Sequence, residues 1–361
     1  MERALAGAHR AAARDLLEVL STIESVGRII VATDDPRWGR TLSDLPVTLD
    51  VDPVNVRFHF GRRLNDLIER YGVRRVLYTG GGSAPLLGLE QWTEILDRLG
   101  RAERLVITNN VHSCDWAAFT PAAEAASLIA KQSNDNAIAW TLANEAGFPV
   151  QALPPSAGSR FDIDTPVDLL IAQRHGGIGP CLRRYLDDLG WESPQLDQVE
   201  AEMRREGGSL IVAGRASATS WEALQQATRC WVRVFSEERG MRASGRQRRG
   251  EVRSLLATHL ALVGFDAFFE TLADLASGVL LDNRVILASR GLWPSTLDRF
   301  NSDLYRWRDV EDPFLRSLTR AAAQAAVPVV MGGHTVVAGG LMALAETVRA
   351  GRTVSEGDSE Q

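Results

Sequence analysis

The sequence predicts an α/β protein with a doubly wound, mostly parallel sheet, followed by a second α/β half that is rich in helices. Short β-branched runs alternate four times with helical stretches within about the first 150 residues, and this alternation is typical of parallel sheets. Polar or glycine-rich residues follow most of these runs directly. The length of 361 residues fits two domains, or one large α/β domain with additions.

The elements of the first half follow from local patterns. Apolar residues recur at helical spacing over residues 4–26, and glycine ends the later helical pattern at residue 147. Thr165 and Pro166 have the residue types of an N-cap and a first helical position. We expect helices over 4–26, 61–71, 89–99, 134–146 and 166–172, and strands over 28–33, 75–79, 104–108 and 149–153.

The second half begins after a stretch rich in glycine, proline and charge around residues 175–210. We expect strands over 210–213, 231–235, 279–286 and 327–331, helices over 219–228, 312–326 and 338–350, and more than one long helix within 251–277. The predicted domains are therefore residues 1–175, residues 176–350, and a disordered tail over 351–361.

Charge composition limits the ligands. The net charge of -6 and the pI of about 5.6 argue against nucleic acid as a partner. Lys131 is the single lysine, and every other basic residue is arginine. Any phosphate or carboxylate that this protein binds must therefore be held by arginine, by backbone amides or by a metal ion.

Three cysteines, Cys114, Cys181 and Cys230, lie far apart and have no metal-ligand spacing. The N-terminal segment lacks the uninterrupted apolar run of a secretory signal, and no stretch is long enough to span a membrane. We expect a cytoplasmic, soluble protein with no membrane partner.

Candidate ligand-binding residues follow the predicted strands, because ligands of open α/β sheets bind beyond the carboxyl ends of the strands. The nucleotide-binding candidates at these positions are Thr33, Asp34, Gly80, Gly81, Gly82, Ser83 and Asn109. Two interpretations of residues 80–83 remain open: a backbone cradle for phosphate or a tight turn between strand and helix. Asp34 is also compatible with a simple turn before Pro36.

Residues 28–170 resemble, in motif order, the molybdopterin-type nucleotidyltransferases and are most similar to the phospholactate guanylyltransferases. The matching segments are IIVATDDP, VLYTGGGSAPLLGLEQWTEIL, RLVITNN, EAGFPVQAL and FDIDTPVDL. The resemblance implies a glycosyltransferase-A-type (nucleotide-diphospho-sugar transferase-like) fold. It also implies transfer of a nucleotidyl group from a nucleoside triphosphate, with Mg²⁺, to a small phosphorylated or carboxylated acceptor.

Two departures from the family pattern concern the metal and the phosphates. The family's opening strand and glycine-rich loop would precede the helix over 4–26, and the turn over 81–85 lacks the family's aspartate. Asp162 and Asp164 are the candidate metal ligands, and Asp115 is a candidate replacement for the absent aspartate. Asp162 and Asp164 are also compatible with a structural turn into the helix over 166–172.

The second half has a candidate anion site of its own. Arg239 follows a predicted strand, and Gly332, Gly333, His334 and Thr335 join a strand to a helix, which is an arrangement that can seat an anion. The arginine-rich run over 242–250 is open to two interpretations, an anion-binding loop or a solvated connector.

Two functional hypotheses follow. In the first, the chain is a nucleotidyltransferase whose second half supplies the acceptor pocket or a contact with a second copy of the chain. In the second, it is a catalytically degenerate member that binds a small molecule or acts as a scaffold. A start upstream of Met1 would supply the family's opening segment and would favour the first hypothesis.

Overall fold

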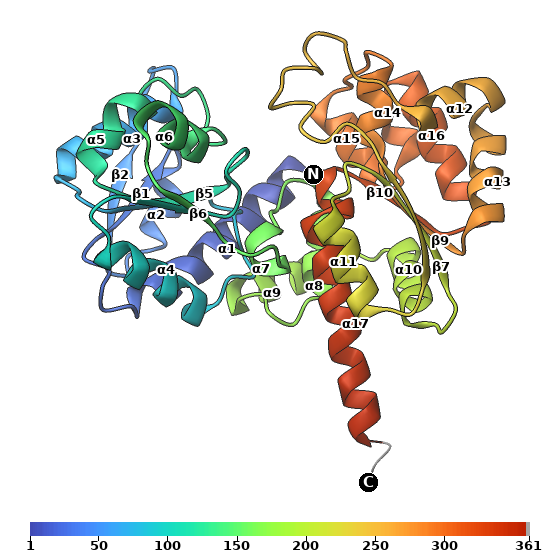
Figure 1. Ribbon diagram of the computed structural model, residues 1–361, viewed down its shortest axis with the longest axis horizontal. Coiled ribbons are helices and arrows are strands. Elements are labelled where there is room, and N and C mark those ends of the chain that lie inside the picture. The colour runs from blue at the N-terminus through green and yellow to red at the C-terminus, as the bar shows by residue number, and fades with distance from the viewer. Residues whose placement is uncertain (359–361) are drawn as a thin grey trace. The chain divides into compact units, whose positions relative to one another are not determined.

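The computed structural model describes the backbone of residues 1–358 and the side chains of residues 1–351. The chain forms two compact units (Figure 1). The C-terminal unit comprises Met1–Ala8, Ser156–Ile178 and the chain from Arg183 onward, and the N-terminal unit comprises His9–Pro155 and Gly179–Leu182. The C-terminal unit therefore begins at Ser156, earlier than the predicted boundary at residue 175. The reason is that α7 (Ala157–Arg160) and α8 (Pro166–Arg174) pack against α17 (Gly339–Asp358).

The N-terminal unit contains a mixed sheet of four strands in the order β3-β5-β4-β6 and a separate parallel pair, β1-β2. Its elements are α1 (Glu2–Ser21, which starts in the C-terminal unit), β1 (Ile29–Thr33), α2 (Pro36–Arg40), β2 (Val47–Val51), α3 (Phe60–Tyr71), β3 (Val76–Thr79), α4 (Leu89–Arg101), β4 (Leu105–Thr108), β5 (Trp116–Thr120), α5 (Ala122–Ile129), α6 (Ile138–Ala146) and β6 (Val150–Ala152).

Helices cover both faces of this four-stranded sheet. On one face, α3, α5 and α6 pack against Val106 and Phe119. On the other, α1 and α4 pack against Ile107 and Trp116, and the rings of Trp92 and Trp116 meet edge to face with their centroids 5.2 Å apart. The alternation of side chains along each strand thus supplies two cores.

The sequence predicts a mostly parallel sheet, but β5 runs antiparallel to both β3 and β4, so the four-stranded sheet of the N-terminal unit is mixed. The sequence did not predict β5 or β2. The β5 sequence WAAFT is fully buried, has two alanines at its centre and has a single β-branched residue, Thr120, so it lacks the run of β-branched residues by which the other strands are recognised.

The C-terminal unit is built on a four-stranded parallel sheet in the order β10-β9-β7-β8. Its elements are α7, α8, α9 (Pro180–Leu189), α10 (Pro194–Arg204), β7 (Ser209–Gly214), α11 (Ala218–Ala227), β8 (Trp231–Ser236), α12 (Leu255–Val263), α13 (Phe265–Leu275), β9 (Gly278–Asp282), α14 (Asn283–Ser289), α15 (Thr296–Asp303), η1 (Trp307–Asp309), α16 (Pro313–Gln324), β10 (Val329–Gly332), η2 (His334–Val337) and α17.

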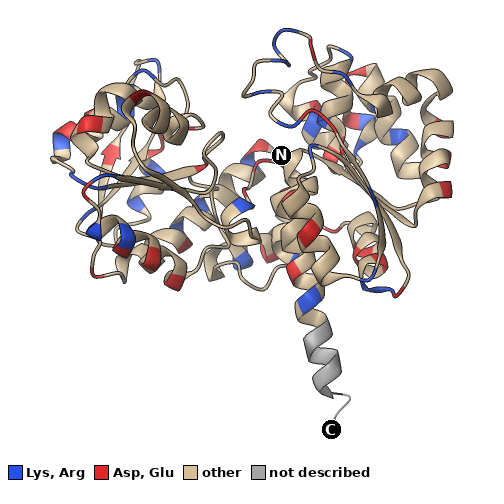
Figure 2. Cartoon of the chain, in the orientation of Figure 1, with Lys and Arg blue, Asp and Glu red and all other residues tan. Residues whose placement is uncertain are grey.

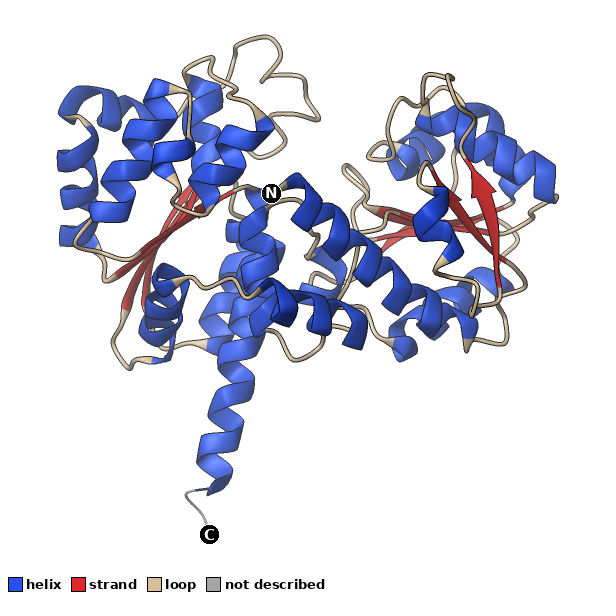
Figure 3. Cartoon of the chain, turned by 180° about the vertical axis from the view of Figure 1, so that it is seen from behind, coloured by secondary structure: helices blue, strands red, loops and turns tan. Residues whose placement is uncertain are grey.

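Helices also cover both faces of the parallel sheet, as Figure 3 shows from behind. Residues of α12, α13 and α16 form one core with the strand residues Ile211, Val279 and Val329. On the opposite face, α10 contacts β7, β9 and β10, and α17 packs on α10 and α11. The α/β class with mostly parallel sheets is therefore confirmed.

Two local expectations in this unit are corrected, and a third is confirmed. The strand predicted over 279–286 ends at Asp282, where the Asp282 side chain caps α14 by accepting a hydrogen bond from the amide of Arg284. The apolar run that follows is buried on all sides and therefore shows no helical periodicity. The helices expected within 251–277 are confirmed as α12 and α13, and Gly264 between them has φ +85°. Helix α17 continues to Asp358 within the predicted tail, whose residues 359–361 lie outside the described part.

Candidate functional site

At one edge of the N-terminal sheet, the residues that follow β3 and β4 lie close to the residues that precede β5. Because β5 runs antiparallel between β3 and β4, Thr79 pairs with Trp116, and Thr108 pairs with Ala117. The start of β5 therefore lies beside the ends of β3 and β4. Hence the strand order brings Asp115 to the same edge as the turn over 80–83 and Asn109.

Hydrogen bonds join these residues. The Asn109 amide donates to Asp115 Oδ2 at 2.5 Å, and the Asp115 backbone N–H donates to Asn109 Oδ1 at 3.0 Å. The Ser83 hydroxyl donates to the Asp115 carbonyl oxygen at 3.1 Å. Asn109 is buried, with 2% of its surface exposed, so its two bonds to Asp115 fix the position of that carboxylate.

The glycine turn offers backbone donors at this edge. The amides of Gly81 and Gly82 donate no hydrogen bond to any residue in the part of the chain that the structure describes. The turn is held by the Ser83 amide, which donates to the Gly80 carbonyl, and by Ala84 with φ +50°. Successive N–H groups without protein acceptors form a concavity suited to an anion.

Thr33 and Asp34 lie at the end of β1, in the separate two-stranded sheet. The Thr33 hydroxyl accepts a hydrogen bond from the amide of Asp35, and the Asp35 carboxylate caps α2. Strand pairing does not join β1 to β3 in the described structure, so it does not bring Thr33 and Asp34 to the edge that holds Asn109.

Asp162 and Asp164 belong to the C-terminal unit, whereas Asp115 belongs to the N-terminal unit. The Asp162 carboxylate accepts from the amide of Ile163 at 3.0 Å. The predicted cap of α8 is confirmed: Asp168 Oδ2 accepts from the amides of Asp164 and Thr165 at 2.9 and 2.7 Å. Burial, reinforced by the charge of Asp164, raises the pKa of Asp168 to about 8.

Among the described residues, a different trio has the spacing of a metal site. Single ligand atoms of Asp15, Glu18 and Cys181 lie within 4.8 Å of one another. The Asp15 carboxylate, however, accepts from the amides of Cys181 and Leu182 at 2.8 Å each, which explains its position as a cap of α9. A thiol is also a poor ligand for Mg²⁺.

The C-terminal unit has the strand order of a doubly wound sheet with a switch point between β7 and β9. If the four strands are numbered in the order of the sequence, their order across the sheet, from β8 to β10, is 2-1-3-4. Ligands of such sheets bind where this order reverses, beyond the carboxyl ends of the strands. Asp282 ends β9 there, and Arg215 directly follows β7.

Arg215 and Asp282 form a bidentate ion pair at this point. Arg215 Nε lies 2.6 Å from Asp282 Oδ2, and Nη2 lies 3.1 Å from Oδ1. The Asp282 side chain is fully buried and that of Arg215 is 12% exposed. Burial alone would raise the pKa of Asp282, but the Arg215 guanidinium outweighs it and lowers the pKa. The carboxylate thus stays ionised.

The predicted anion site over 332–335 lies near this ion pair. His334 interacts electrostatically with Arg215, Asp282 and Arg239. Its side chain reaches solvent, yet the surrounding protein, and next the charge of Arg215, lower the pKa of His334 to about 4. A neutral imidazole at pH 7 can donate or accept a hydrogen bond.

The turn around His334 is packed rather than open. A Cβ on Gly332 would lie 2.5 Å from Val167, and one on Gly333 would lie 3.3 Å from Thr165, so both glycines accommodate α8. Residues 334–337 form the short helix η2, and α17 starts only at Gly339. Helix α17 thus begins within one residue of the predicted start at residue 338, and the amides that directly follow Gly333 belong to η2.

Sequence reasoning missed Arg215 and Asp303. Asp303 pairs with Arg284 at 2.6 Å, and both side chains are buried. The signal available for Arg215 was a Gly-Arg pair after the buried run over 210–213. Asp303 lies inside a helix, where nothing local distinguishes it.

A comparison of the chain with protein-family models and with curated proteins returned no match. Among the residues that the structure describes, no helix has both the length and the apolar character needed to cross a bilayer.

Proposed function

We propose that the protein is a nucleotidyltransferase whose N-terminal unit has a glycosyltransferase-A-type fold and binds a nucleoside triphosphate at the edge formed by residues 80–83, Asn109 and Asp115. The observation that carries this proposal is that two amides, those of Gly81 and Gly82, have no acceptor among the described residues and lie beside a fixed carboxylate. Phosphate oxygens suit such amides.

The carboxylate of Asp115 is a ligand type that suits Mg²⁺, but it is a single ligand. Magnesium is commonly held by one or two carboxylates together with substrate phosphates and water. Asp115 would hold the ion, which would supply neutralisation of charge on the phosphate oxygens. Asn109 would orient Asp115, and Gly81 and Gly82 would donate to the phosphate. Asp162 and Asp164, which belong to the other unit, stay proposed ligands.

Thermal unfolding with GTP, CTP, ATP or UTP plus Mg²⁺ tests the proposal. We expect one nucleotide to raise the melting temperature, and Asp115→Asn to lose that increase. Asp97→Asn, an exposed aspartate on α4, is the matched control and should keep it. The same measurement on Asp164→Ala tests the proposed role of Asp164 as a metal ligand. No stabilisation by any of the four nucleotides would refute nucleotide binding.

A second candidate function is favoured by the C-terminal unit. Arg215, Asp282 and His334 meet at the β7/β9 switch point, which is where doubly wound sheets bind ligands. In this alternative the protein binds a small anionic molecule there without nucleotidyl transfer. A screen of carboxylate and phosphate metabolites by thermal shift should then give a ligand whose effect is lost in His334→Ala and Arg239→Ala but kept in Asp162→Ala.

A further inference from the structure

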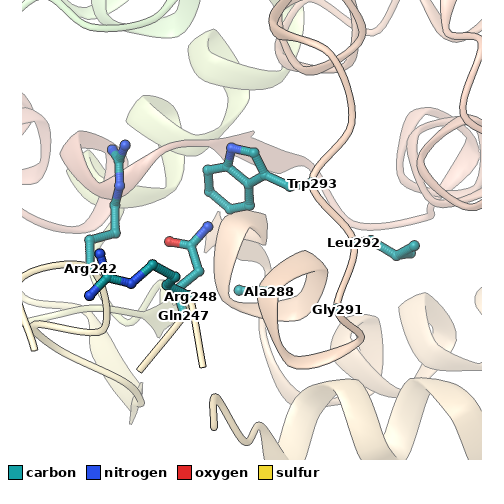
Figure 4. A pocket seen from close by; sticks show the side chains of 7 residues that line it. All are labelled: Arg242, Gln247, Arg248, Ala288, Gly291, Leu292 and Trp293. Carbon is teal, nitrogen blue, oxygen red and sulfur yellow. The ribbon is translucent and has the colours of Figure 1, made fainter. Parts of the chain in front are cut away.

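A separate pocket lies between the loop over 237–253 and the end of α14. It has a volume of about 400 Å³, within the range of small-molecule sites. Figure 4 shows that Arg242, Gln247 and Arg248 reach it from the loop, while Trp293 follows α14. Ala288, Gly291 and Leu292 complete the lining.

The loop is held by its own hydrogen bonds, and most residues of the arginine-rich run over 242–250 are exposed to solvent, so both interpretations of that run stay open. Gly240, Gly245 and Gly250 have φ values of +73°, +71° and +68°, so each makes a turn that side-chain-bearing residues rarely adopt. Backbone amides along the loop donate to carbonyls within it. Met241 is fully buried against Val252 and Ala288, which fastens the loop to α14. The pocket is therefore preformed.

The acidic residues of the loop are already occupied. Glu238 pairs with Arg246 at 2.8 Å, and Glu251 pairs with Arg249 at 2.7 Å. The Glu237 carboxylate accepts from the hydroxyl of Ser254 and the amide of Leu255, at 2.6 Å each.

Arg242 and Arg248, by contrast, have no carboxylate partner among the described residues. The loop between β8 and α12 carries several blue segments in Figure 2, although the whole chain has a net charge of -6. Two guanidinium groups of the pocket thus remain available to an anion.

A third guanidinium concentrates the positive charge. Arg299 and Arg242 lie 4.9 and 6.0 Å from the ring centroid of Trp293. Burial, and next the charges of Arg284 and Arg242, lower the pKa of Arg299. Like charges held together in this way repel one another, and a bound anion would relieve that repulsion.

We propose that this pocket binds a small organic phosphate. Arg242 and Arg248 would hold the phosphate through guanidinium forks, which match its geometry, and the amide of Gln247 would donate to it. The carbon part of the ligand would lie on the indole of Trp293, 40% of which is exposed, and on the methyl group of Ala288. The residues that line this pocket do not include Arg239 or His334, nor any residue of the edge formed by residues 80–83, Asn109 and Asp115.

Calorimetric titration with phenyl phosphate and with inorganic phosphate, in buffer free of nucleotide and divalent cations, tests the site. The intact protein should bind phenyl phosphate more tightly than inorganic phosphate, because only the former has a ring to stack on Trp293. Each lost guanidinium should weaken binding about tenfold, so Arg242→Gln/Arg248→Gln should bind about a hundredfold more weakly. Binding of phenyl phosphate to the intact protein should change the fluorescence of Trp293. Trp293→Phe should lose this change but keep its affinity for inorganic phosphate.

The control Arg229→Gln/Arg233→Gln removes two exposed arginines of the same unit and should bind as the intact protein does. Asp115→Asn and His334→Gln should also leave binding unchanged, which separates this pocket from the sites of the proposed functions. Melting temperatures of all variants report whether they are folded. Equal affinity in the Arg242→Gln/Arg248→Gln variant, an equal loss in the control, or no binding by the intact protein at millimolar phenyl phosphate would overturn the proposal.

Discussion

The guanidinium of Arg215 holds the carboxylate of Asp282 in a fork, with distances of 2.6 and 3.1 Å between paired atoms. Arg215 follows β7 and Asp282 ends β9, two neighbouring parallel strands far apart in sequence. The pair therefore ties together the two strands at the switch point of the C-terminal sheet. It also keeps Asp282 ionised in a position from which that residue caps α14.

Removing the carboxylate of Asp282 should leave the mostly buried guanidinium of Arg215 without its ion-pair partner. We expect Asp282→Ala to lower the free energy of unfolding by about 3 kcal/mol, because one charge of a buried pair stays uncompensated. The midpoint of urea unfolding measures this. Asp266→Ala, at an exposed position on α13, should change the midpoint little. Equal effects of the two changes would contradict a stabilising role for the ion pair.

Gly214 is expected to tolerate no side chain. Its φ is +121°, and a Cβ there would lie 2.5 Å from the Cβ of Asp282. Gly214→Ala should cost about 3 kcal/mol through strain and collision. Gly264→Ala is the matched comparison, because Gly264 has φ +85° but a Cβ there would meet no atom within 4 Å; it should cost about 1 kcal/mol. If both variants have the same melting temperature, the close approach of residue 214 to Asp282 adds nothing to the cost of the substitution.

His334 should make stability depend on pH. The pKa of His334 falls to about 4 in the folded protein, compared with about 6.5 for an unperturbed histidine. Between these values the unfolded chain binds the additional proton, so stability falls as the pH is lowered from about 6.5 to about 4. His334→Gln should show a shallower decline over this interval in urea titrations at several pH values. Parallel curves for the two proteins would show that the imidazole titrates normally.

Asn109 should matter for both stability and the nucleotide edge. Asn109→Ala removes two hydrogen bonds to Asp115 inside the sheet edge, and we expect a loss of about 2 kcal/mol. Asn144→Ala, at an exposed position, should cost far less. The nucleotide-dependent rise in melting temperature should also shrink in Asn109→Ala, since Asp115 loses its orientation. If Asn109→Ala keeps the full nucleotide-dependent rise in melting temperature, nucleotide binding does not require Asn109 to orient Asp115.

Much of the fold could be predicted because its signals are local. The β-branched runs gave β1, β3, β7, β8 and β10 nearly at their bounds. The Thr165 cap with Pro166 gave the start of α8. Strand β5 escaped because alanines carry little strand signal. The run after Asp282 was assigned to the wrong class because full burial removes the periodicity that separates helix from strand.

The sequence by itself determined which residue types were available to chemistry: arginine as nearly the sole cation, glycine turns after strands, and aspartates near helix starts. The tertiary structure alone decided which of them meet. It placed Ser83 beside Asp115 through an antiparallel strand, and Arg215 beside Asp282 through the order of a parallel sheet. Local patterns record hydrogen bonding and burial within a few residues, whereas these contacts depend on strand order, which is set by packing across the whole core.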